Sequence, residues 1–195
     1  MRVTGLRAPR PGRVAVELDG ARWRVLPLEV VVRAGLRVGE ELDRPRLRLL
    51  RRELRRHQAI TAAAGALRHR DHSTSSLEQK LQRRGIAPGE RGAAVETLTR
   101  AGLVDDGRFA ANRARVLAGR GYGDAAIRVD LEAHGLDGAP VAEAIGALEP
   151  EFERAREHAA RRGGGLRAAR WLASRGFDPE ALEGLVAEDG GAALT

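Results

Sequence analysis

A short pattern that ends a helix occurs three times along the chain, and it restricts the fold to repeated helical units. In each copy a Leu precedes a Gly by four residues, and an apolar residue follows the Gly. The three copies are Leu81, Gly85 and Ile86; Leu131, Gly135 and Leu136; and Leu172, Gly176 and Phe177. A Gly in the left-handed conformation commonly closes a helix, and the next apolar residue folds back onto the last turn. We therefore expect positive φ at helix ends for all three glycines.

The segments around each copy complete a unit of three short helices. An Ala-rich helical stretch precedes each copy, at 58–68, 107–118 and 152–161, and a short amphipathic segment follows it. Aromatic residues are only 3% of the chain although apolar residues are 43%, so Leu, Val and Ala must build the core, which favours closely packed helices. Self-similarity at this spacing is typical of helical repeat proteins.

The first 43 residues follow a different pattern. Apolar and polar residues alternate on both sides of Asp19-Gly20, which predicts a β-hairpin because both turn residues tolerate positive φ. The segment "RVTGLRA" is a candidate third strand. So small a sheet is marginal by itself, and we expect it to pack on "LEVVVRAGLRVGEEL" or on the following helices.

A strongly basic helix is predicted from Arg44, with Pro45 in its first turn. Leu47, Leu50 and Leu54 share one face at helical spacing. The opposite arc carries Arg48, Arg51, Arg52, Arg55 and Arg56. Seven arginines and one glutamate give residues 44–56 a net charge of +6, out of +7 for the whole chain. A local basic block of this kind favours an anionic partner, either nucleic acid or an acidic protein surface.

Two adjacent acids, Asp105 and Asp106, invite a metal-binding or acid–base interpretation. They follow Val104 and precede Phe109, which opens a helical pattern. An Asp at this position accepts a bond from a free backbone N–H and faces the positive end of the helix dipole. A metal site would need further ligands, and no HxxxH, HExxH or DxDxDG pattern occurs. We interpret the pair as a structural helix start.

Other candidates for chemistry are weak. His69, Asp71 and His72 are the nearest approach to a metal site, and we interpret them as a solvated helix end. Gly119, Gly121 and Gly123 resemble a phosphate loop only superficially, because no Gly-Lys-Ser/Thr follows. We place these glycines between two helices.

The composition excludes further functions. The chain has no Cys, so disulfides, thiolate metal sites and a Cys nucleophile are excluded. It has no apolar run long enough to span a membrane. The first residues lack the apolar centre of a signal peptide, so we expect a cytoplasmic protein that is not membrane-bound.

One segment resembles a known family. "GLVDDGRFAANRARVLAGRGYGDAAIRVDLEAHGLD" (102–137) is similar to the central signature of the RecX family, regulators of the RecA recombinase. "HSTSSLEQKLQRRG" resembles the upstream helix of that family, and "RWLASRGFDPEALEGLV" its C-terminal unit. The N-terminal hairpin with "GLRVGEELD" resembles the β-rich extension that some members carry.

The resemblance implies a mainly α fold of tandem three-helix repeats in an elongated, curved module. It implies a mainly negative regulator that binds the RecA–DNA filament along its groove and restrains strand exchange, ATP hydrolysis and coprotease activity. Such a protein is not an enzyme and needs no metal or cofactor. We expect a monomer that contacts DNA weakly or through the filament. Asp105, Asp106, Phe109, Gly121 and Gly123 are signature positions of the family.

The predicted organisation has five parts. They are a β-rich extension (1–43), a basic helix with repeat 1 (44–102), repeat 2 (103–148), repeat 3 (149–189) and a flexible tail (190–195). Fourteen basic and five acidic residues give 44–102 a charge of +9, whereas 103–195 carries −4. We therefore expect the first part of the repeat region to bind the partner, through the five arginines named above together with Arg83 and Arg84.

Three alternatives remain open. The arginines can form an ordinary solvated face. The chain can be a helical DNA-binding protein that acts without RecA, since Arg-rich helices suit phosphates. It can also be a hydrolase that uses the Asp pair.

Overall fold

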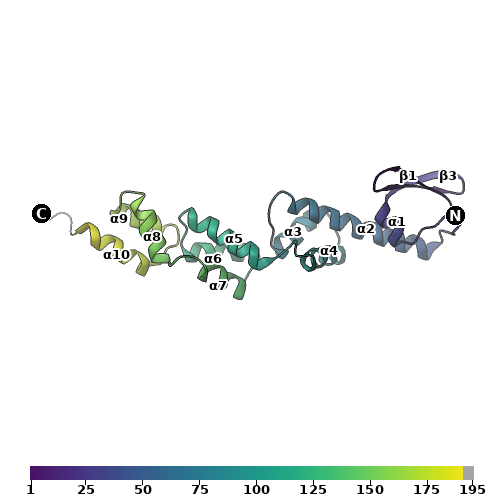
Figure 1. Cartoon of the computed structure of the whole chain (residues 1–195). Coiled ribbons are helices and arrows are strands. Elements are labelled where there is room, and N and C mark those ends of the chain that lie inside the picture. Colours follow the sequence, from purple (N-terminus) through teal and green to yellow (C-terminus); the bar gives the residue numbers. More distant parts are fainter. Residues whose placement is uncertain (191–195) are drawn as a thin grey trace. The chain divides into compact units, whose positions relative to one another are not determined.

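The computed structural model describes residues 1–190, and these residues form ten helices and three strands (Figure 1). The prediction of a mainly helical chain with a small N-terminal sheet is confirmed. The chain divides into two compact units, which are described separately below. The first comprises Met1–His69 with Lys80–Leu98, and the second Arg70–Gln79 with the chain from Thr99 onward. The predicted tail (190–195) lies outside the described residues except for Gly190, the last residue of the final helix.

The N-terminal strands form an antiparallel sheet in the order β1-β2-β3. They span Val3–Arg10, Arg13–Leu18 and Ala21–Pro27. The turn between β2 and β3 has φ 49° at Asp19 and 85° at Gly20, so the predicted hairpin is confirmed. The candidate third strand is β1.

One face of this sheet packs on α1 (Leu28–Arg33) and on the start of α2 (Arg44–Leu67). Val16 and Val30 are fully buried there, and Leu47 and Leu54 of α2 pack against the same core. The outer edge of β1 is hydrogen-bonded by the segment that leads into α2: the Val3 nitrogen donates to the Glu40 carbonyl at 2.9 Å. The sheet is therefore supported by both "LEVVVR" and α2, as expected from its small size.

Two further helices follow α2. They are α3 (Thr74–Arg83), whose residues are shared between the two units, and α4 (Pro88–Arg100), which lies mainly in the first.

The second unit contains two groups of three helices. The first group is α5 (Asp106–Gly119), α6 (Asp124–Ala133) and α7 (Ala139–Gly146). The second group is α8 (Glu151–Ala160), α9 (Gly165–Ala173) and α10 (Pro179–Gly190). Each group has its own core, built around Ile127 and Leu131 in one and Leu172 and Phe177 in the other. The exact limits of the three repeats stay a prediction.

The three repeated glycines have the expected geometry. Their φ angles are 74° at Gly85, 74° at Gly135 and 77° at Gly176, each just after a helix. In each copy the apolar residue after the Gly donates its N–H to the carbonyl of the repeated Leu. The N···O distances are 3.2 Å from Ile86 to Leu81, 3.2 Å from Leu136 to Leu131 and 3.3 Å from Phe177 to Leu172. The Leu-x3-Gly-apolar pattern therefore specifies the same helix ending three times.

Candidate functional site

The basic face of α2 begins at a well-formed helix start. The Asp43 carboxylate accepts a hydrogen bond from the Arg46 nitrogen at 2.9 Å, and Pro45 lies in the first turn. Arg48, Arg51 and Arg52 then project into solvent. With Pro45, Leu49 and Arg55 they line a shallow hollow of about 540 Å³ that has no acidic residue in its wall. This hollow concentrates positive charge on one side of the helix.

The arginines of α2 differ in their intramolecular partners. Arg48 and Arg51 form no ion pair with other described residues, and Arg52 lies 3.5 Å from Glu53. Arg55 instead bonds Glu90 of α4, with 2.7 Å between Nε and Oε1, and this bond lowers the pKa of Glu90. Arg56 is only half-exposed. Arg48, Arg51 and Arg52, here called the α2 arginine triad, are thus best placed to meet a ligand.

Arg83 and Arg84 do not extend this triad. Arg84 donates to the Ala62 carbonyl at 3.3 Å, on the C-terminal half of α2. Ala62 is ten residues beyond Arg52, which is about 15 Å along a helix. Arg83 is exposed in the last turn of α3, where a cation stabilises the helix dipole. The role of these residues in partner binding stays a prediction.

The two adjacent acids serve different helices. Asp105 is the N-cap of its own helix, and its Oδ1 accepts from the Arg108 nitrogen at 2.9 Å. Asp106 reaches across to the start of α3, where Oδ1 accepts from the Thr74 nitrogen and Oδ2 from the Thr74 hydroxyl. Both carboxylates are therefore occupied by helix termini.

The same arrangement recurs where α8 meets α6. Glu151 is the first residue of α8, as Asp106 is of α5, and its Oε1 accepts from the Asp124 nitrogen at 2.7 Å. Asp124 begins α6, as Thr74 begins α3. An acid that opens one group of helices thus caps the middle helix of the group before it.

Small residues allow this close packing. Gly123 donates its N–H to the Arg175 carbonyl at 2.9 Å, and a Cβ there would lie 2.2 Å from the Gly176 oxygen. Gly121 has φ 78°, and a Cβ would lie 2.7 Å from the Trp171 ring. Phe109 is buried in the core of its group against His134, with ring centroids 5.4 Å apart. Phe109, Gly121 and Gly123, which are signature positions of the predicted family, thus make contacts that pack the helices together.

The segment from His69 to His72 was interpreted above as a solvated helix end. This interpretation is wrong for His72. His69 is exposed, whereas His72 is only 4% exposed. The His72 Nδ1 lies 3.1 Å from the Ser76 hydroxyl. Ser73, which follows, caps α3 by accepting from the Ser76 nitrogen at 3.1 Å. Among the described residues no three metal-ligating side chains come together.

A column of alternating cations and rings was not anticipated from the sequence. The Arg162 guanidinium lies 3.4 Å from the Trp171 ring centroid, and Arg175 lies 4.8 Å from the same ring. Arg175 also lies 4.5 Å from the Tyr122 ring. Trp171 belongs to α9, and the other three residues come from three separate turns between helices, so spacing along the sequence gives no sign of the column. Guanidinium groups stacked by their faces keep their N–H edges available for anions.

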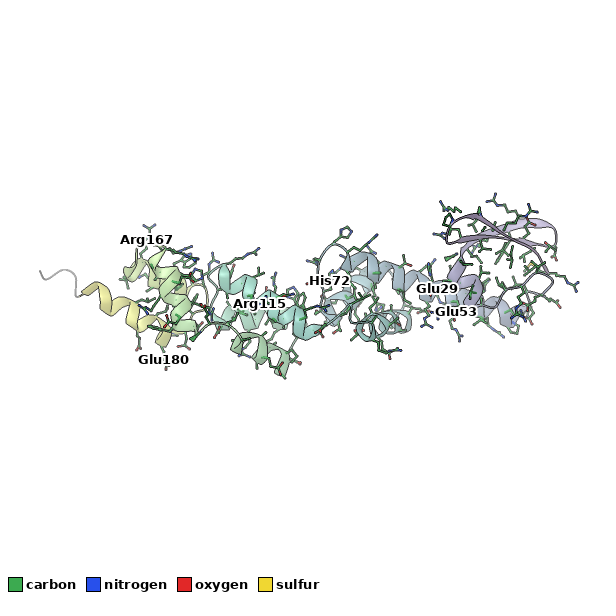
Figure 2. All side chains as sticks on the ribbon, viewed as in Figure 1. Glu29, Glu53, His72, Arg115, Arg167 and Glu180 are labelled. Atoms are coloured by element: carbon green, nitrogen blue, oxygen red, sulfur yellow. The ribbon has the colours of Figure 1, made fainter. Side chains whose placement is uncertain are left out.

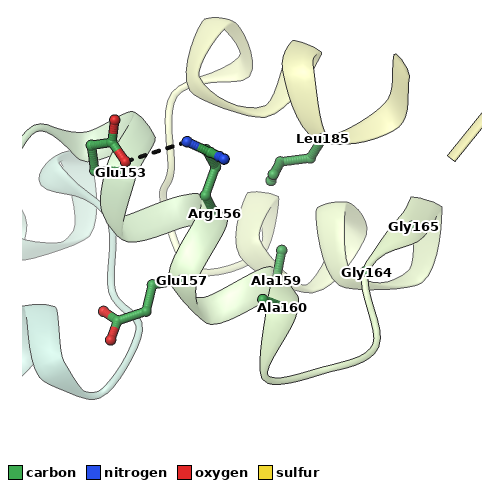
Figure 3. Close-up of a pocket in the computed structure, with 8 residues that line it drawn as sticks. All are labelled: Glu153, Arg156, Glu157, Ala159, Ala160, Gly164, Gly165 and Leu185. Atoms are coloured by element: carbon green, nitrogen blue, oxygen red, sulfur yellow. Dashed lines mark ion pairs between the residues drawn. The ribbon is translucent and has the colours of Figure 1, made fainter. Parts of the chain in front are cut away.

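A small hollow lies between α8 and α10 in the second unit (Figure 3). Its volume is about 450 Å³, and its floor includes Ala159 and Leu185. Arg156 is paired with Glu153 at 3.6 Å, and Glu157 points away from this pair. The lining has no Ser, Cys or His beside the carboxylates, so it lacks a nucleophile with an adjacent base.

Charged side chains of the second unit lie mostly on helix surfaces. Figure 2 shows Arg167 projecting from α9 and Arg115 from α5. Arg154 is an exception, since its side chain is only 6% exposed. It bonds Asp124 and donates to the Tyr122 and Glu149 carbonyls at 3.1 and 2.9 Å. No helix in the described part of the chain is long and apolar enough to cross a membrane.

The fold and the surface define the class of protein. It is a mainly helical protein with a small N-terminal sheet, and its candidate binding arginines lie on the exposed face of a helix. The RecX regulatory proteins of Xanthomonas oryzae pv. oryzae (strain MAFF 311018) and Stenotrophomonas maltophilia (strain K279a) are each 39% identical to it. The alignments cover 67% and 68% of this chain and 88% and 87% of those proteins. The chain belongs to the RecX family of regulatory proteins, which confirms the resemblance.

Solved structures agree on the fold. A crystal structure of a regulatory protein RecX matches with a TM-score of 0.79 over 93% of this chain and 97% of its own, at 21% identity. The RecX structure from Lactobacillus salivarius matches with a TM-score of 0.57 over 69% of this chain and 96% of its own, at 20% identity. No protein-family model matches the chain.

Proposed function

We propose that this protein is a mainly negative regulator of RecA that binds the RecA–DNA filament along its groove. By occupying the groove it restrains strand exchange, ATP hydrolysis and coprotease activity in recombination and SOS repair. It acts in the cytoplasm as a monomer, without catalytic groups or a cofactor. Membership of a family of regulatory proteins supports this proposal, and so does the concentration of positive charge on α2.

The α2 arginine triad is the observation that carries the proposal. The hollow beside it is lined by four arginines and no acid, and two of these arginines, Arg48 and Arg51, form no ion pair with other described residues. Arg48 and Arg52 are one helical turn apart, so their guanidinium groups reach the same side of the helix. Planar guanidinium groups bind phosphates and carboxylates in bidentate fashion. A filament of RecA on DNA offers both kinds of anion, the phosphates of the DNA and the carboxylates of the protein.

Salt dependence helps to distinguish the two targets. If the triad meets DNA phosphates, removing one arginine–phosphate interaction flattens the dependence of log affinity on log salt by about 0.7–0.9. If the triad meets carboxylates of RecA, salt still weakens binding, but the effect requires the filament and is absent with DNA alone.

The test is charge reversal of the triad, Arg48→Glu/Arg51→Glu/Arg52→Glu. Arg55 is left in place because its bond to Glu90 holds α2 to α4. The matched control, Arg128→Glu/Arg167→Glu/Arg170→Glu, reverses three exposed arginines of α6 and α9. We expect the triad variant to keep its thermal melt but to need at least about tenfold more protein to inhibit RecA-driven strand exchange. Inhibition by the triad variant at the wild-type concentration would exclude α2 as the contact surface.

One alternative function has its own observation. The column of Arg162, Trp171, Arg175 and Tyr122 presents stacked cations and rings, which also suit single-stranded DNA. A DNA-binding protein that acts without RecA would bind an oligonucleotide equally well with and without RecA. Arg162→Ala/Arg175→Ala would then abolish binding, whereas the filament regulator would retain its RecA-dependent binding.

A further inference from the structure

A second basic hollow lies in the first unit, between β3 and the C-terminal half of α2. Its volume is about 680 Å³. The walls carry Arg13, Arg24, Arg68 and Arg84 together with His57 and His69, and no Asp or Glu lines it. The α2 arginine triad belongs to a different stretch of the helix and is not part of this hollow, here called the β3 groove.

The positive charge of the β3 groove is not neutralised within the described part of the chain. Arg13, Arg24 and Arg68 are exposed and form no ion pair with other described residues. Among the pairs formed by lining residues, the His57 Nδ1 lies 3.3 Å from the Glu29 carboxylate, which also bonds the Arg33 Nε at 2.9 Å. Four guanidinium groups around one hollow therefore favour a ligand with several negative charges.

One wall of the groove is an open sheet edge. The outer edge of β1 is paired at its first residue, because Val3 exchanges hydrogen bonds with Gly39 and Glu40 at 2.8 and 2.9 Å. In the described chain β3 pairs with β2 alone, and its residues Arg24–Pro27 line the groove. An unpartnered strand edge is a template for an added extended chain, whose backbone supplies the missing hydrogen bonds.

The floor and the length of the groove also suit a peptide. Val25, Leu26, Leu54 and Ala62 give it aliphatic walls, and its lining has no Phe, Tyr or Trp, the large rings on which bases of a single strand commonly stack. From Leu54 to Arg68 the α2 wall runs about 21 Å. A strand of that length has about six residues.

We propose that the β3 groove binds an extended, acidic segment of a partner protein, about six residues long. The segment adds to the edge of β3, its alternate apolar side chains face the aliphatic walls, and its carboxylates meet Arg13, Arg24, Arg68 and Arg84. This interaction goes beyond the regulation of RecA proposed above and does not depend on it, because the groove shares no residue with the triad and needs no filament.

The experiment uses the full chain and a fluorescein-labelled octapeptide of alternating Glu and Val, followed by fluorescence anisotropy. The groove variant is Arg24→Glu/Arg68→Glu, and the matched control is Arg167→Glu/Arg170→Glu on α9. We expect the peptide to bind saturably, the groove variant to bind it at least about tenfold more weakly, and the control to bind it within about twofold of wild type. The same peptide with alternate backbone nitrogens methylated should also bind at least about fivefold more weakly, because it cannot complete the edge.

Three outcomes would overturn the proposal. They are no saturable binding up to roughly 1 mM peptide, an equal loss in the α9 control, and preferential binding of an oligo-dT that the groove variant abolishes. The last result would make nucleic acid the occupant. If the circular dichroism spectrum shows that the charge-reversal variant is unfolded, Arg24→Gln/Arg68→Gln replaces it in the test, since this variant removes the positive charge without introducing repulsion. The triad variant should bind the peptide normally, so failure here and failure of the filament proposal are distinguishable.

Discussion

Asp106 and Thr74 are joined by two hydrogen bonds, with 2.8 Å from Oδ1 to the Thr74 nitrogen and 2.7 Å from Oδ2 to the Thr74 hydroxyl. Thr74 begins α3 and Asp106 begins α5, so the carboxylate caps a helix other than its own. A negative charge at a helix N-terminus satisfies a free N–H and faces the positive end of the dipole. The adjacent acids thus hold two helix starts together, Asp105 locally and Asp106 across the fold.

Replacing Asp106 with Ala should lower the free energy of unfolding by about 1–3 kcal/mol, because the Thr74 nitrogen and hydroxyl both lose their acceptor in a partly buried site. Asp105→Ala should cost about 0.5–2 kcal/mol, as expected for loss of an N-cap. Urea denaturation followed by circular dichroism measures both. If calorimetry showed stoichiometric binding of Mg²⁺ or Mn²⁺ that Asp106→Ala abolished, the interpretation of the two acids as helix caps would be wrong.

Glu151 should behave like Asp106 because it occupies the equivalent position. Glu151→Ala removes the acceptor of the Asp124 nitrogen, at 2.7 Å, and should cost about 1–2 kcal/mol in urea denaturation. Glu153→Ala is the control, since Glu153 is exposed on the same helix and pairs with Arg156 at 3.6 Å. It should change stability by no more than about 0.5 kcal/mol. Equal effects of the two changes would contradict the cross-helix cap.

The repeated glycines should not be equally sensitive. Gly85 and Gly135 both have φ 74°, but a Cβ at Gly85 would meet nothing within 4 Å, whereas at Gly135 it would lie 2.2 Å from the Ser75 hydroxyl. Gly85→Ala should therefore cost about 1–2 kcal/mol from the backbone alone. Gly135→Ala should cost more, because the α3 side chain must also move. Thermal melts of the two variants give the comparison, and a smaller loss at Gly135 would refute the close contact.

The Arg113–Asp130 pair should make stability depend on pH in the acid range. Two hydrogen bonds of 2.7 Å from the Arg113 guanidinium lower the pKa of Asp130. A carboxyl whose pKa is lower in the folded state stabilises the fold above its unfolded pKa, about 3.9. This contribution is lost as the pH falls through the folded-state pKa. Asp130→Asn should thus be about 1 kcal/mol less stable at pH 7.

The difference between wild type and Asp130→Asn should shrink as the pH falls below about 4. Urea midpoints measured across the acid range test this. His134 also lies 3.6 Å from the Asp130 carboxylate, so the comparison is repeated in a His134→Gln background. If the stability difference between wild type and Asp130→Asn instead grew as the pH fell, the stabilising role of the charged Asp130 carboxylate would be contradicted.

The sequence predicted those parts of the fold that depend only on residues adjacent along the chain. Gly85, Gly135 and Gly176 require positive φ, and Asp19-Gly20 requires a tight hairpin, whatever surrounds them. A run of hydroxyl residues leads into α3, and Thr74 or Ser75 is an equally plausible cap by residue type, yet Ser73 provides it. Helix starts are commonly misplaced by one or two residues for this reason.

Contacts between distant segments were not predictable from spacing. The Asp106 carboxylate meets α3, and the buried Arg154 meets Asp124, only once the helices are packed. Arg55 is equivalent to Arg51 on a helical wheel, yet Glu90 of α4 pairs with it. A helical wheel assigns each side chain to a face of its helix, but it does not show which other helix packs against that face.

The binding of this protein to the RecA–DNA filament is tested most directly by co-sedimentation. RecA is assembled on single-stranded DNA with ATP, and this chain is added before centrifugation, beside samples that contain RecA alone or DNA alone. We expect the chain to pellet with the filament and to stay in the supernatant with RecA alone, and the triad variant to pellet much less. Wild-type protein that remains in the supernatant in the presence of filaments would contradict filament binding.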